Sequence, residues 1–267
     1  MGIDAGAGVA LSLEGRVALV TGGSRGIGAA TVRMFRRAGA RVVFSYRAAE
    51  VQARALVAEC GGEDMCRAVK QDLATAADGG ALVNAAVAAF GRLDCMVVNH
   101  GVWPAHDAPI SEMTDAQWRS TLGINLDSVF GLVRAGVAQM KRQTHLHGAR
   151  GHIVLVASTA AQRGEAFHAD YAASKGALVS LTKSLSSELA REGIYANCVA
   201  PGWVVTEMSA AALKHPETSK KVLATIPVGR AARVEEIAGP ILFLCTPLAG
   251  FVSGEIFNVN GGAVLVG

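Results

Sequence analysis

The run VALVTGGSRGIG, residues 17–28, carries the strongest structural signal in this chain. A short apolar stretch leads into a glycine-rich turn, and an amphipathic helical pattern begins at the end of that turn. Glycines allow a tight turn and let a diphosphate approach the backbone where a helix begins, since free N–H groups and the helix dipole favour anions there. The position of the turn between a strand and a helix therefore predicts a nucleotide site. The turn residues assigned to it are Gly22, Ser24, Arg25, Gly26 and Gly28.

The same strand-to-helix transition recurs along the chain. Segments of helical period, such as the one with Leu178, Leu181, Leu185 and Leu189 on one face, alternate with short β-branched apolar runs. This alternation predicts an α/β fold, a single doubly wound (Rossmann) domain with a mostly parallel sheet and helices on both faces. The predicted strands are 17–20, 41–45, 66–71, 93–99, 152–157, 195–200 and 255–259. Residues 205–225 break this rhythm, and we expect an insertion over one edge of the sheet.

Length and composition agree with one large domain. The chain has 267 residues, of which 51% are hydrophobic and only 18% charged, as expected for a sheet covered on both faces. No apolar run reaches the ~18 residues that span a bilayer, and the N-terminus lacks the basic start of a signal peptide. We therefore expect a cytoplasmic protein without a membrane partner, with a mobile tail at 1–12 and the domain at 13–267.

The remaining composition argues against metal and nucleic-acid sites. The five cysteines are odd in number and form no C-x-x-C pair, which favours small buried hydrophobes over metal ligands or disulfides. His145 and His147 lack acidic or cysteine neighbours, which indicates a solvated loop. A net charge of +3 is too small to indicate a nucleic-acid partner.

The second predicted strand indicates which nucleotide binds. An acidic residue at its end is typical of NAD sites, because it hydrogen-bonds the adenosine ribose. Here the strand ends in Tyr46-Arg47 without an acid. Arg47, with Arg25 from the glycine turn, can form charge-assisted bonds to a 2′-phosphate, unless both are only solvated. We therefore predict NADP(H) over NAD(H), with Asp72-Leu73 placed to meet the adenine amino group or, alternatively, serving only to start a helix.

Tyr171 and Lys175 form the candidate catalytic pair. Their i, i+4 spacing places both side chains on one helix face. An unperturbed tyrosine has a pKa of about 10, and a cation one turn away lowers that pKa, which gives a usable general acid or base. Ser158 follows the fifth predicted strand, at the carboxyl edge where ligands bind in open α/β sheets, and its hydroxyl can hydrogen-bond a substrate oxygen.

Together these features resemble a short-chain dehydrogenase/reductase of the classical type. The resemblance runs from about Leu13 to Gly262 and is closest in look to 3-oxoacyl-acyl carrier protein reductases. The motifs that carry it are TGGSRGIG at 21–28, Asp72, Asn99-His100-Gly101, Asn125, Ser158, Tyr171-Ala-Ala-Ser-Lys175, Pro201-Gly202 followed by Thr206, and the tail from Gly254 to Gly262.

The resemblance implies a catalytic tetrad of Asn125, Ser158, Tyr171 and Lys175. In that scheme Tyr171 protonates a carbonyl oxygen that Ser158 positions. Lys175 lowers the pKa of Tyr171 and holds the nicotinamide ribose, while Asn125 keeps a water in line for proton relay. It also implies a seven-stranded sheet, a homotetramer and a substrate lid at about 205–225. The further residues that it places at the cofactor are Ile27, Asn99, Gly101, Pro201, Gly202 and Thr206.

The chain departs from the family pattern after the fourth predicted strand. The usual Asn-Asn-Ala-Gly reads Val98-Asn99-His100-Gly101. His100 replaces a small residue near the expected nicotinamide pocket, where it serves either packing and backbone bonding or substrate contact. His168 is a pocket residue or a surface residue. The other candidates for a substrate wall are the loop residues Trp103, Trp203 and Met208, which can also simply pack.

The substrate class stays open at this stage. The resemblance implies a small-molecule carbonyl or alcohol, possibly a 3-oxoacyl thioester. An acidic carrier protein needs basic residues near the site mouth, and Ser186-Ser187-Glu188 stands where such reductases often place an arginine, so that partner is doubtful. The alternatives are an NAD-dependent alcohol, sugar or polyol dehydrogenase and, remotely, a dinucleotide-binding sensor without activity.

Overall fold

A seven-stranded sheet runs through the centre of the protein, in a computed structural model that describes residues 10–265. The strand order is β3-β2-β1-β4-β5-β6-β7, and every neighbouring pair is parallel. The strands are β1 (Val17–Val20), β2 (Arg41–Tyr46), β3 (Cys66–Lys70), β4 (Cys95–Val98), β5 (Gly151–Val156), β6 (Ile194–Pro201) and β7 (Ile256–Val259). The predicted doubly wound class is confirmed, and the bounds of each predicted strand lie within two residues of an observed strand.

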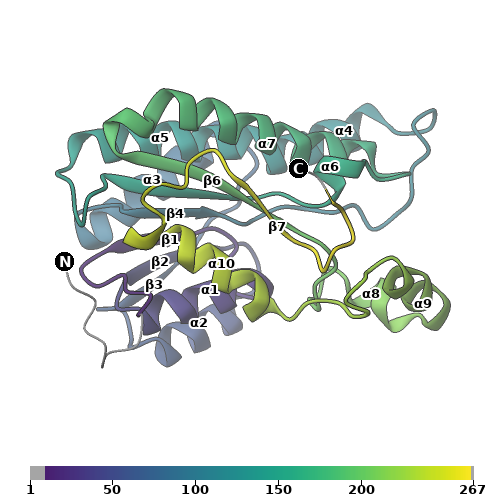
Figure 1. Cartoon of the computed structure of the whole chain (residues 1–267), viewed down its shortest axis with the longest axis horizontal. Coiled ribbons are helices and arrows are strands. Elements are labelled where there is room, and N and C mark those ends of the chain that lie inside the picture. Colours follow the sequence, from purple (N-terminus) through teal and green to yellow (C-terminus); the bar gives the residue numbers. More distant parts are fainter. Residues whose placement is uncertain (1–9, 266–267) are drawn as a thin grey trace.

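Helices cover both faces of the sheet (Figure 1). One face carries α1 (Gly26–Arg37), α2 (Glu50–Glu59) and α10 (Val234–Leu244). The other carries α3 (Ala76–Phe90), α5 (Ser128–Arg142) and α7 (Ala169–Leu189), with α4 (Asp115–Leu122) beside α7. A π-helical turn, η1 (Gly123–Asp127), joins α4 to α5, and the short α6 (Ala160–Arg163) precedes α7. Two 3₁₀ turns, η2 (Ala190–Glu192) and η3 (Pro247–Ala249), complete the connections.

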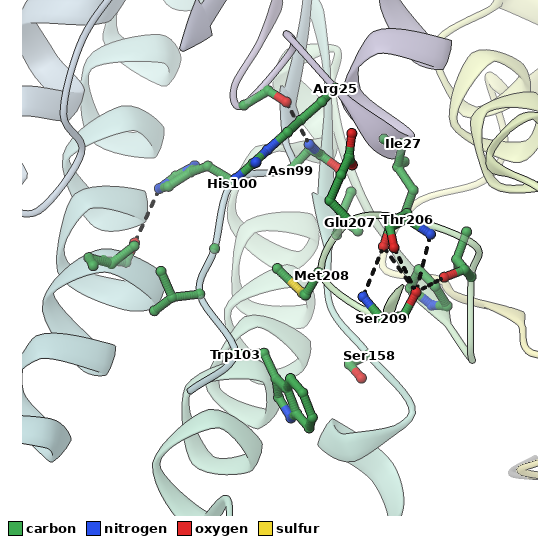
Figure 2. A pocket seen from close by; sticks show the side chains of 18 of the residues that line it. Arg25, Ile27, Asn99, His100, Trp103, Ser158, Thr206, Glu207, Met208 and Ser209 are labelled. Atoms are coloured by element: carbon green, nitrogen blue, oxygen red, sulfur yellow. Dashed lines mark hydrogen bonds between the residues drawn. The ribbon is translucent and has the colours of Figure 1, made fainter. Parts of the chain in front are cut away.

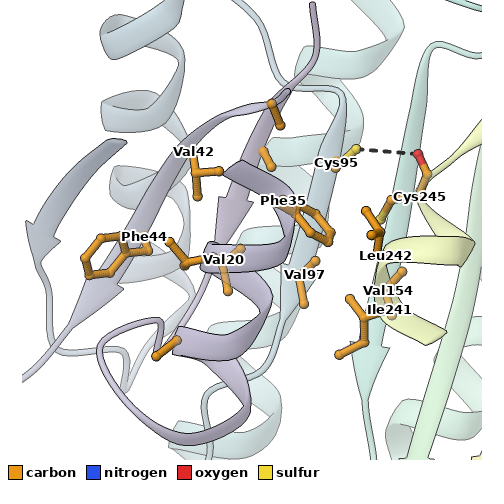
Figure 3. Close-up of a cluster of buried hydrophobic side chains, with 14 of the residues drawn as sticks. Val20, Phe35, Val42, Phe44, Cys95, Val97, Val154, Ile241, Leu242 and Cys245 are labelled. Carbon is orange, nitrogen blue, oxygen red and sulfur yellow. Dashed lines mark hydrogen bonds between the residues drawn. The ribbon is translucent and has the colours of Figure 1, made fainter. Parts of the chain in front are cut away.

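Each central strand contributes to two hydrophobic cores, because successive residues of a strand point to opposite faces. In β1, Val20 packs with Val97 of β4 and with Phe35 of α1 in the core beneath α1 and α10 (Figure 3). Leu19 and Met96, next to them in the same strands, pack on the opposite side of the sheet. This double burial explains why the strands are apolar throughout instead of alternating with polar residues.

The parts of the chain outside this frame lie at its ends and after β6. Residues 1–9 of the predicted mobile tail lie outside the described residues, and residues 10–12 are exposed and without regular structure. Residues 205–225 contain α8 (Ala210–Lys214) and α9 (Pro216–Ala224), which stand apart from the helices that cover the sheet (Figure 1). All five cysteines are buried and free, as the sequence predicts. In residues 10–265, no helix is long and apolar enough to cross a membrane.

Two glycines set the distance between α3 and α5, which positions η1 beside the sheet. A Cβ atom on Gly79 would lie 2.4 Å from the Leu132 backbone nitrogen and 2.5 Å from the Ser128 carbonyl oxygen. A Cβ atom on Gly131 would lie 2.0 Å from the Ala76 carbonyl oxygen. The two backbones therefore touch at a point where no side chain fits.

This close approach predicts opposite effects of alanine at two adjacent positions. Gly79→Ala should lower the free energy of unfolding by about 1–3 kcal/mol, because the helices must separate. Gly80→Ala is the matched control: nothing lies within 4 Å of its added Cβ, so alanine should raise the free energy by up to ~1 kcal/mol through helix propensity. Urea denaturation measures both. Equal changes at the two positions would contradict the close approach.

Candidate active site

A pocket of about 550 Å³ lies at the carboxyl ends of the strands, where the order of the parallel sheet reverses between β1 and β4 (Figure 2). It brings together most of the predicted site residues. Those that line it are Gly22, Ser24, Arg25, Gly26, Ile27, Tyr46, Arg47, Asp72, Leu73, Asn99, His100, Gly101, Trp103, Ser158, Tyr171, Lys175, Pro201, Gly202, Trp203, Thr206 and Met208. Gly28, Asn125 and His168 do not line it.

The glycine turn forms one wall of the pocket, at the start of α1. Gly22 and Gly26 have φ of 63° and 54°, a region that favours glycine. A Cβ atom on Gly28 would lie 2.2 Å from the Gly22 carbonyl oxygen, so Gly28 shapes the turn from behind the wall. The Gly22 N–H donates to Ser45 Oγ at 3.1 Å and the Gly23 N–H to the Ser45 carbonyl at 2.8 Å. The turn is therefore a rigid cradle without side chains, and its shape fits a diphosphate.

Two arginines line the pocket on the β2 side of this cradle. Arg25 and Arg47 are both exposed, and Tyr46, the last residue of β2, is half-buried. Within residues 10–265 neither guanidinium has an ion-pair partner. The donor set at this end of the pocket fits a phosphate on the adenosine ribose.

The candidate catalytic side chains meet at the other end of the pocket. Tyr171 and Lys175 come from the first two turns of α7, with Lys175 Nζ 5.9 Å from the centre of the Tyr171 ring. Lys175 Nζ also donates to the Val156 carbonyl at the end of β5, at 2.9 Å. Ser158 follows β5, and its Oγ accepts from the Ala160 N–H at 3.1 Å. A hydroxyl, a phenol and an amine thus face one cavity from two elements that pack together.

Burial controls the protonation of this group. It raises the pKa of Tyr171 to about 12, while a hydrogen bond with Ser158 has a smaller, lowering effect. It lowers the pKa of Lys175 to about 8. The expectation that Lys175 brings the pKa of Tyr171 below its usual value is therefore not met in this structure, because burial disfavours the phenolate more than any neighbouring group favours it.

Asn125 lies behind the pocket, in the π-helical turn η1, and is completely buried. Its Oδ1 accepts from the Val102 N–H at 2.8 Å, and its Nδ2 donates to the Val102 carbonyl at 3.0 Å and to Ser174 Oγ at 3.1 Å. A Cβ atom on Gly101 would lie 3.1 Å from Asn125 Oδ1 and 3.2 Å from Lys175 Nζ. Gly101 therefore lies against both groups, and a side chain at this position would crowd them.

His100 uses both ring nitrogens for internal hydrogen bonds. Nδ1 lies 2.8 Å from Thr21 Oγ1, and Nε2 lies 2.8 Å from Ser128 Oγ and 3.1 Å from the Ile124 carbonyl oxygen. Burial, with the charge of Lys175, lowers the pKa of His100 to about 3, so the ring is neutral. Of the two roles expected from the sequence, packing and hydrogen bonding describe this side chain, although part of it lines the pocket.

The structure corrects the expectation that His168 lines the pocket. Its ring is buried and stacks behind the Trp103 ring, with centroids 4.6 Å apart and planes at 7°. His168 Nε2 lies 3.0 Å from the Pro104 carbonyl oxygen, and Trp103 Nε1 donates to Glu165 Oε1 at 3.2 Å. Trp103 is thereby fixed as a wall near Ser158, and Met208 lies beside it in the pocket (Figure 2). His168 immediately precedes α7, and its ring packs against the loop after β4 instead of the pocket.

Several residues that shape the site were not predicted. Ser45 holds the glycine turn, and Ser209 Oγ accepts from the Thr206 N–H at 3.1 Å and bonds the Val204 carbonyl (Figure 2). Asp170 is buried and accepts from the Tyr171 N–H at 2.9 Å and from Thr121 Oγ1 at 2.7 Å. Glu165 joins the wall through Trp103. Only Asp170 carried a sequence signal, as an acid in the first turn of a helix.

Metal ligation has no support in the part of the chain that the structure describes. Among those residues, no group of three or more His, Cys, Asp or Glu side chains is arranged to hold a metal ion.

Comparison with known proteins gives consistent relatives over nearly the whole chain. The family model described as Enoyl-(Acyl carrier protein) reductase matches residues 22–264. A 3-oxoacyl-[acyl-carrier-protein] reductase of Synechocystis is 35% identical over 258 residues, which cover 95% of this chain and 99% of the relative.

Solved structures agree with this fold. A short-chain dehydrogenase/reductase described as a glucose/ribitol dehydrogenase, from Brucella melitensis, superposes with a TM-score of 0.87 at 34% identity, covering 97% of this chain and 100% of its own. A putative 2-deoxy-d-gluconate 3-dehydrogenase from Agrobacterium tumefaciens with bound NADP gives a TM-score of 0.84 at 32% identity, covering 95% and 98%.

The buried lysine predicts that the ligand-free protein is destabilised by its own site. Below about pH 8 Lys175 is charged in the folded and the unfolded chain, so the folded state bears the full cost of burying the charge. Lys175→Met should therefore raise the free energy of unfolding at pH 7 by about 1–3 kcal/mol. From pH 8 to 10.5 the folded lysine loses its proton before the unfolded one does, so the gain should shrink. Thermal denaturation at pH 7 and pH 10 measures it.

Lys183→Met is the matched control, because Lys183 lies exposed on the same helix. We expect it to leave the stability nearly unchanged at both pH values. A Lys175→Met protein that is less stable than the native protein at pH 7 would contradict the cost assigned to this charge.

Proposed function

The chain belongs to the short-chain dehydrogenase/reductase family, and from that premise we propose that it reduces a carbonyl compound to a secondary alcohol, reversibly, with NADP(H). One observation carries the proposal. A single pocket joins the glycine cradle and two guanidinium groups at one end to Ser158, Tyr171 and Lys175 at the other. A dinucleotide and a small substrate need this combination in one continuous cavity.

In this proposal, different residues bind different parts of the cofactor. The glycine cradle takes the diphosphate, Arg25 and Arg47 take the 2′-phosphate, and Asp72 meets the adenine. Asn99, Thr206 and Lys175 hold the nicotinamide half. The bound NADP of the Agrobacterium relative supports this choice over NAD. NADPH, when bound, supplies the hydride that reduces the carbonyl carbon, and NADP⁺ accepts it in the reverse direction.

Tyr171 supplies the proton for the carbonyl oxygen. Burial raises the pKa of Tyr171 to about 12 and so keeps the hydroxyl protonated at neutral pH, the form that a general acid must have before it donates its proton. Ser158 donates a hydrogen bond to the same substrate oxygen and fixes its position. The Lys175 ammonium, one helical turn away, stabilises the phenolate that remains after proton transfer.

The residues at the substrate end of the pocket favour a sugar or polyol over a 3-oxoacyl thioester as the substrate class. The Synechocystis relative supports a 3-oxoacyl thioester, whose chain needs an apolar channel. The pocket near Ser158 is instead part polar, because Glu165, Arg163 and the Trp103 N–H face it beside Met208 and Trp203. This polarity favours a hydroxyl-bearing sugar or polyol, and the Agrobacterium relative is described as a putative dehydrogenase of 2-deoxy-d-gluconate, a hydroxyl-rich compound. A homotetramer is proposed on the family resemblance alone, and an acyl carrier protein is a partner only if the substrate is a 3-oxoacyl thioester.

The proposed reaction is tested by NADPH consumption, with acetoacetyl-coenzyme A in one set of assays and keto-sugars in another. Turnover should fall at least ~100-fold in Tyr171→Phe, because the general acid is lost, while NADPH binding stays nearly unchanged. Lost NADPH binding in this variant would mean that Tyr171 is structural. If NADPH binds but a single-turnover assay with every carbonyl tried shows no oxidation, a dinucleotide sensor replaces the enzyme.

The phosphate assignment is tested by cofactor affinity. Arg47→Ala should weaken NADPH binding by about 1–3 kcal/mol and leave NADH binding nearly unchanged, because only NADPH carries the 2′-phosphate. Fluorescence titration of both cofactors measures the difference. Arg54→Ala, an exposed arginine of α2 that pairs with Glu50, is the control and should change neither affinity. An equal loss for both cofactors in Arg47→Ala would contradict the assignment.

A further inference from the structure

The His100 side chain links the nucleotide cradle to the helices behind it. It follows β4, and its ring points away from Ser158, toward the junction of η1 and α5 (Figure 2). On one side the ring meets Thr21, which immediately precedes the glycine cradle. On the other side it meets Ser128, the first residue of α5, three positions after Asn125.

The hydrogen-bond roles along this link are determined by its neighbours. Thr21 Oγ1 already accepts from the N–H groups of Asn99 at 2.9 Å and His100 at 3.1 Å, so its own proton goes to His100 Nδ1, 2.8 Å away. The Val97 carbonyl, at 3.5 Å, is too distant to compete. Ser128 Oγ donates to the Ile124 carbonyl at 2.7 Å, so it accepts from His100 Nε2–H. Thr21 and Ser128 are thereby each satisfied by His100 and by the backbone, and His100 is satisfied by both hydroxyls.

The link joins the cradle to η1 through side chains, beside the backbone route from Asn99 to Val102 that also holds Asn125. A Cβ atom on Gly22 would lie 3.2 Å from His100 Cα, so the cradle rests directly on this residue. Ser128 and Asn125 are completely buried and do not line the pocket. A small residue at position 100, which the family pattern usually has, reaches neither hydroxyl.

We propose that His100 is a positioning residue that couples the glycine cradle to η1, so that the placement of Asn125 and the affinity of the cradle for the dinucleotide depend on each other. The coupling runs from Thr21 through the imidazole to Ser128. Its effect on affinity rests on the proposed function, whereas its effect on the cradle in the ligand-free protein does not.

The test uses Ser128, because its hydroxyl contacts His100 while the residue itself does not line the pocket. Ser128→Ala should weaken NADPH binding roughly 2- to 30-fold, the range of coupling through buried networks. In a His100→Ala background the same substitution should have almost no further effect, which a double-mutant cycle of NADPH dissociation constants measures. Thr182→Val is the matched control. Thr182 is also completely buried and donates to the carbonyl four residues earlier, Leu178, but lies on α7 without contact to His100.

A second measurement keeps the coupling separate from the cofactor assignment. In the ligand-free protein, hydrogen exchange at the amides of Gly22 and Gly23 should be faster in Ser128→Ala and in His100→Ala than in the native protein, and unchanged in Thr182→Val. If NADPH does not bind the native protein, the proposed function fails while the exchange result still decides the coupling. If the Ser128 and His100 variants only lower the melting temperature, with unchanged exchange at the cradle and additive effects on affinity, the proposal is overturned and His100 is merely structural.

Discussion

The hydrogen bonds around Thr21 are the constraint on which the rest of the site depends. Thr21 is completely buried, and its N–H donates to the Val97 carbonyl at 3.0 Å. Its hydroxyl accepts from the backbone of Asn99, and its carbonyl accepts from the Asn99 side chain at 3.1 Å. These bonds hold the ends of β1 and β4 together at the point where the order of the sheet reverses and the connections diverge. The glycine cradle and the wall at Gly101 therefore start from one fixed point.

From that point a buried polar chain reaches the catalytic helix. Gly101 leads to Val102, whose backbone holds both ends of the Asn125 amide. Asn125 donates to Ser174 Oγ, which in turn donates to the Tyr171 carbonyl at 2.8 Å. Since these groups are removed from water, each hydrogen bond is costly to break. The distance between the nucleotide cradle and the phenol is thus set by the interior of the protein, and the pocket is the space that this frame leaves open.

The sequence predicts the strands and the local motifs better than the side-chain contacts between distant segments. The strands are recognisable because double burial demands continuous apolar runs, and the motifs are recognisable because a turn and a catalytic pair have fixed local spacing. The contacts that fix Trp103 and His100 are different in kind, because Glu165 is 62 residues from Trp103 and Ser128 is 28 residues from His100. Such pairs follow from packing and have no local periodicity. For the same reason neither position predicted for His168, in the pocket or at the surface, is right: its ring is buried behind Trp103.

The charges near Tyr171 influence which substrate groups the site can bind. Burial keeps the pKa of Tyr171 high, and the Glu165 carboxylate raises that pKa further, so negative charge near the phenol is disfavoured twice. The Glu165 carboxylate accepts from Trp103 Nε1 at 3.2 Å, which leaves capacity for further donors. Substrate hydroxyl groups can supply such donors. Under the proposed function, a hydroxyl-bearing carbonyl compound therefore suits the polar part of the wall, while Met208 and Trp203 cover its apolar side.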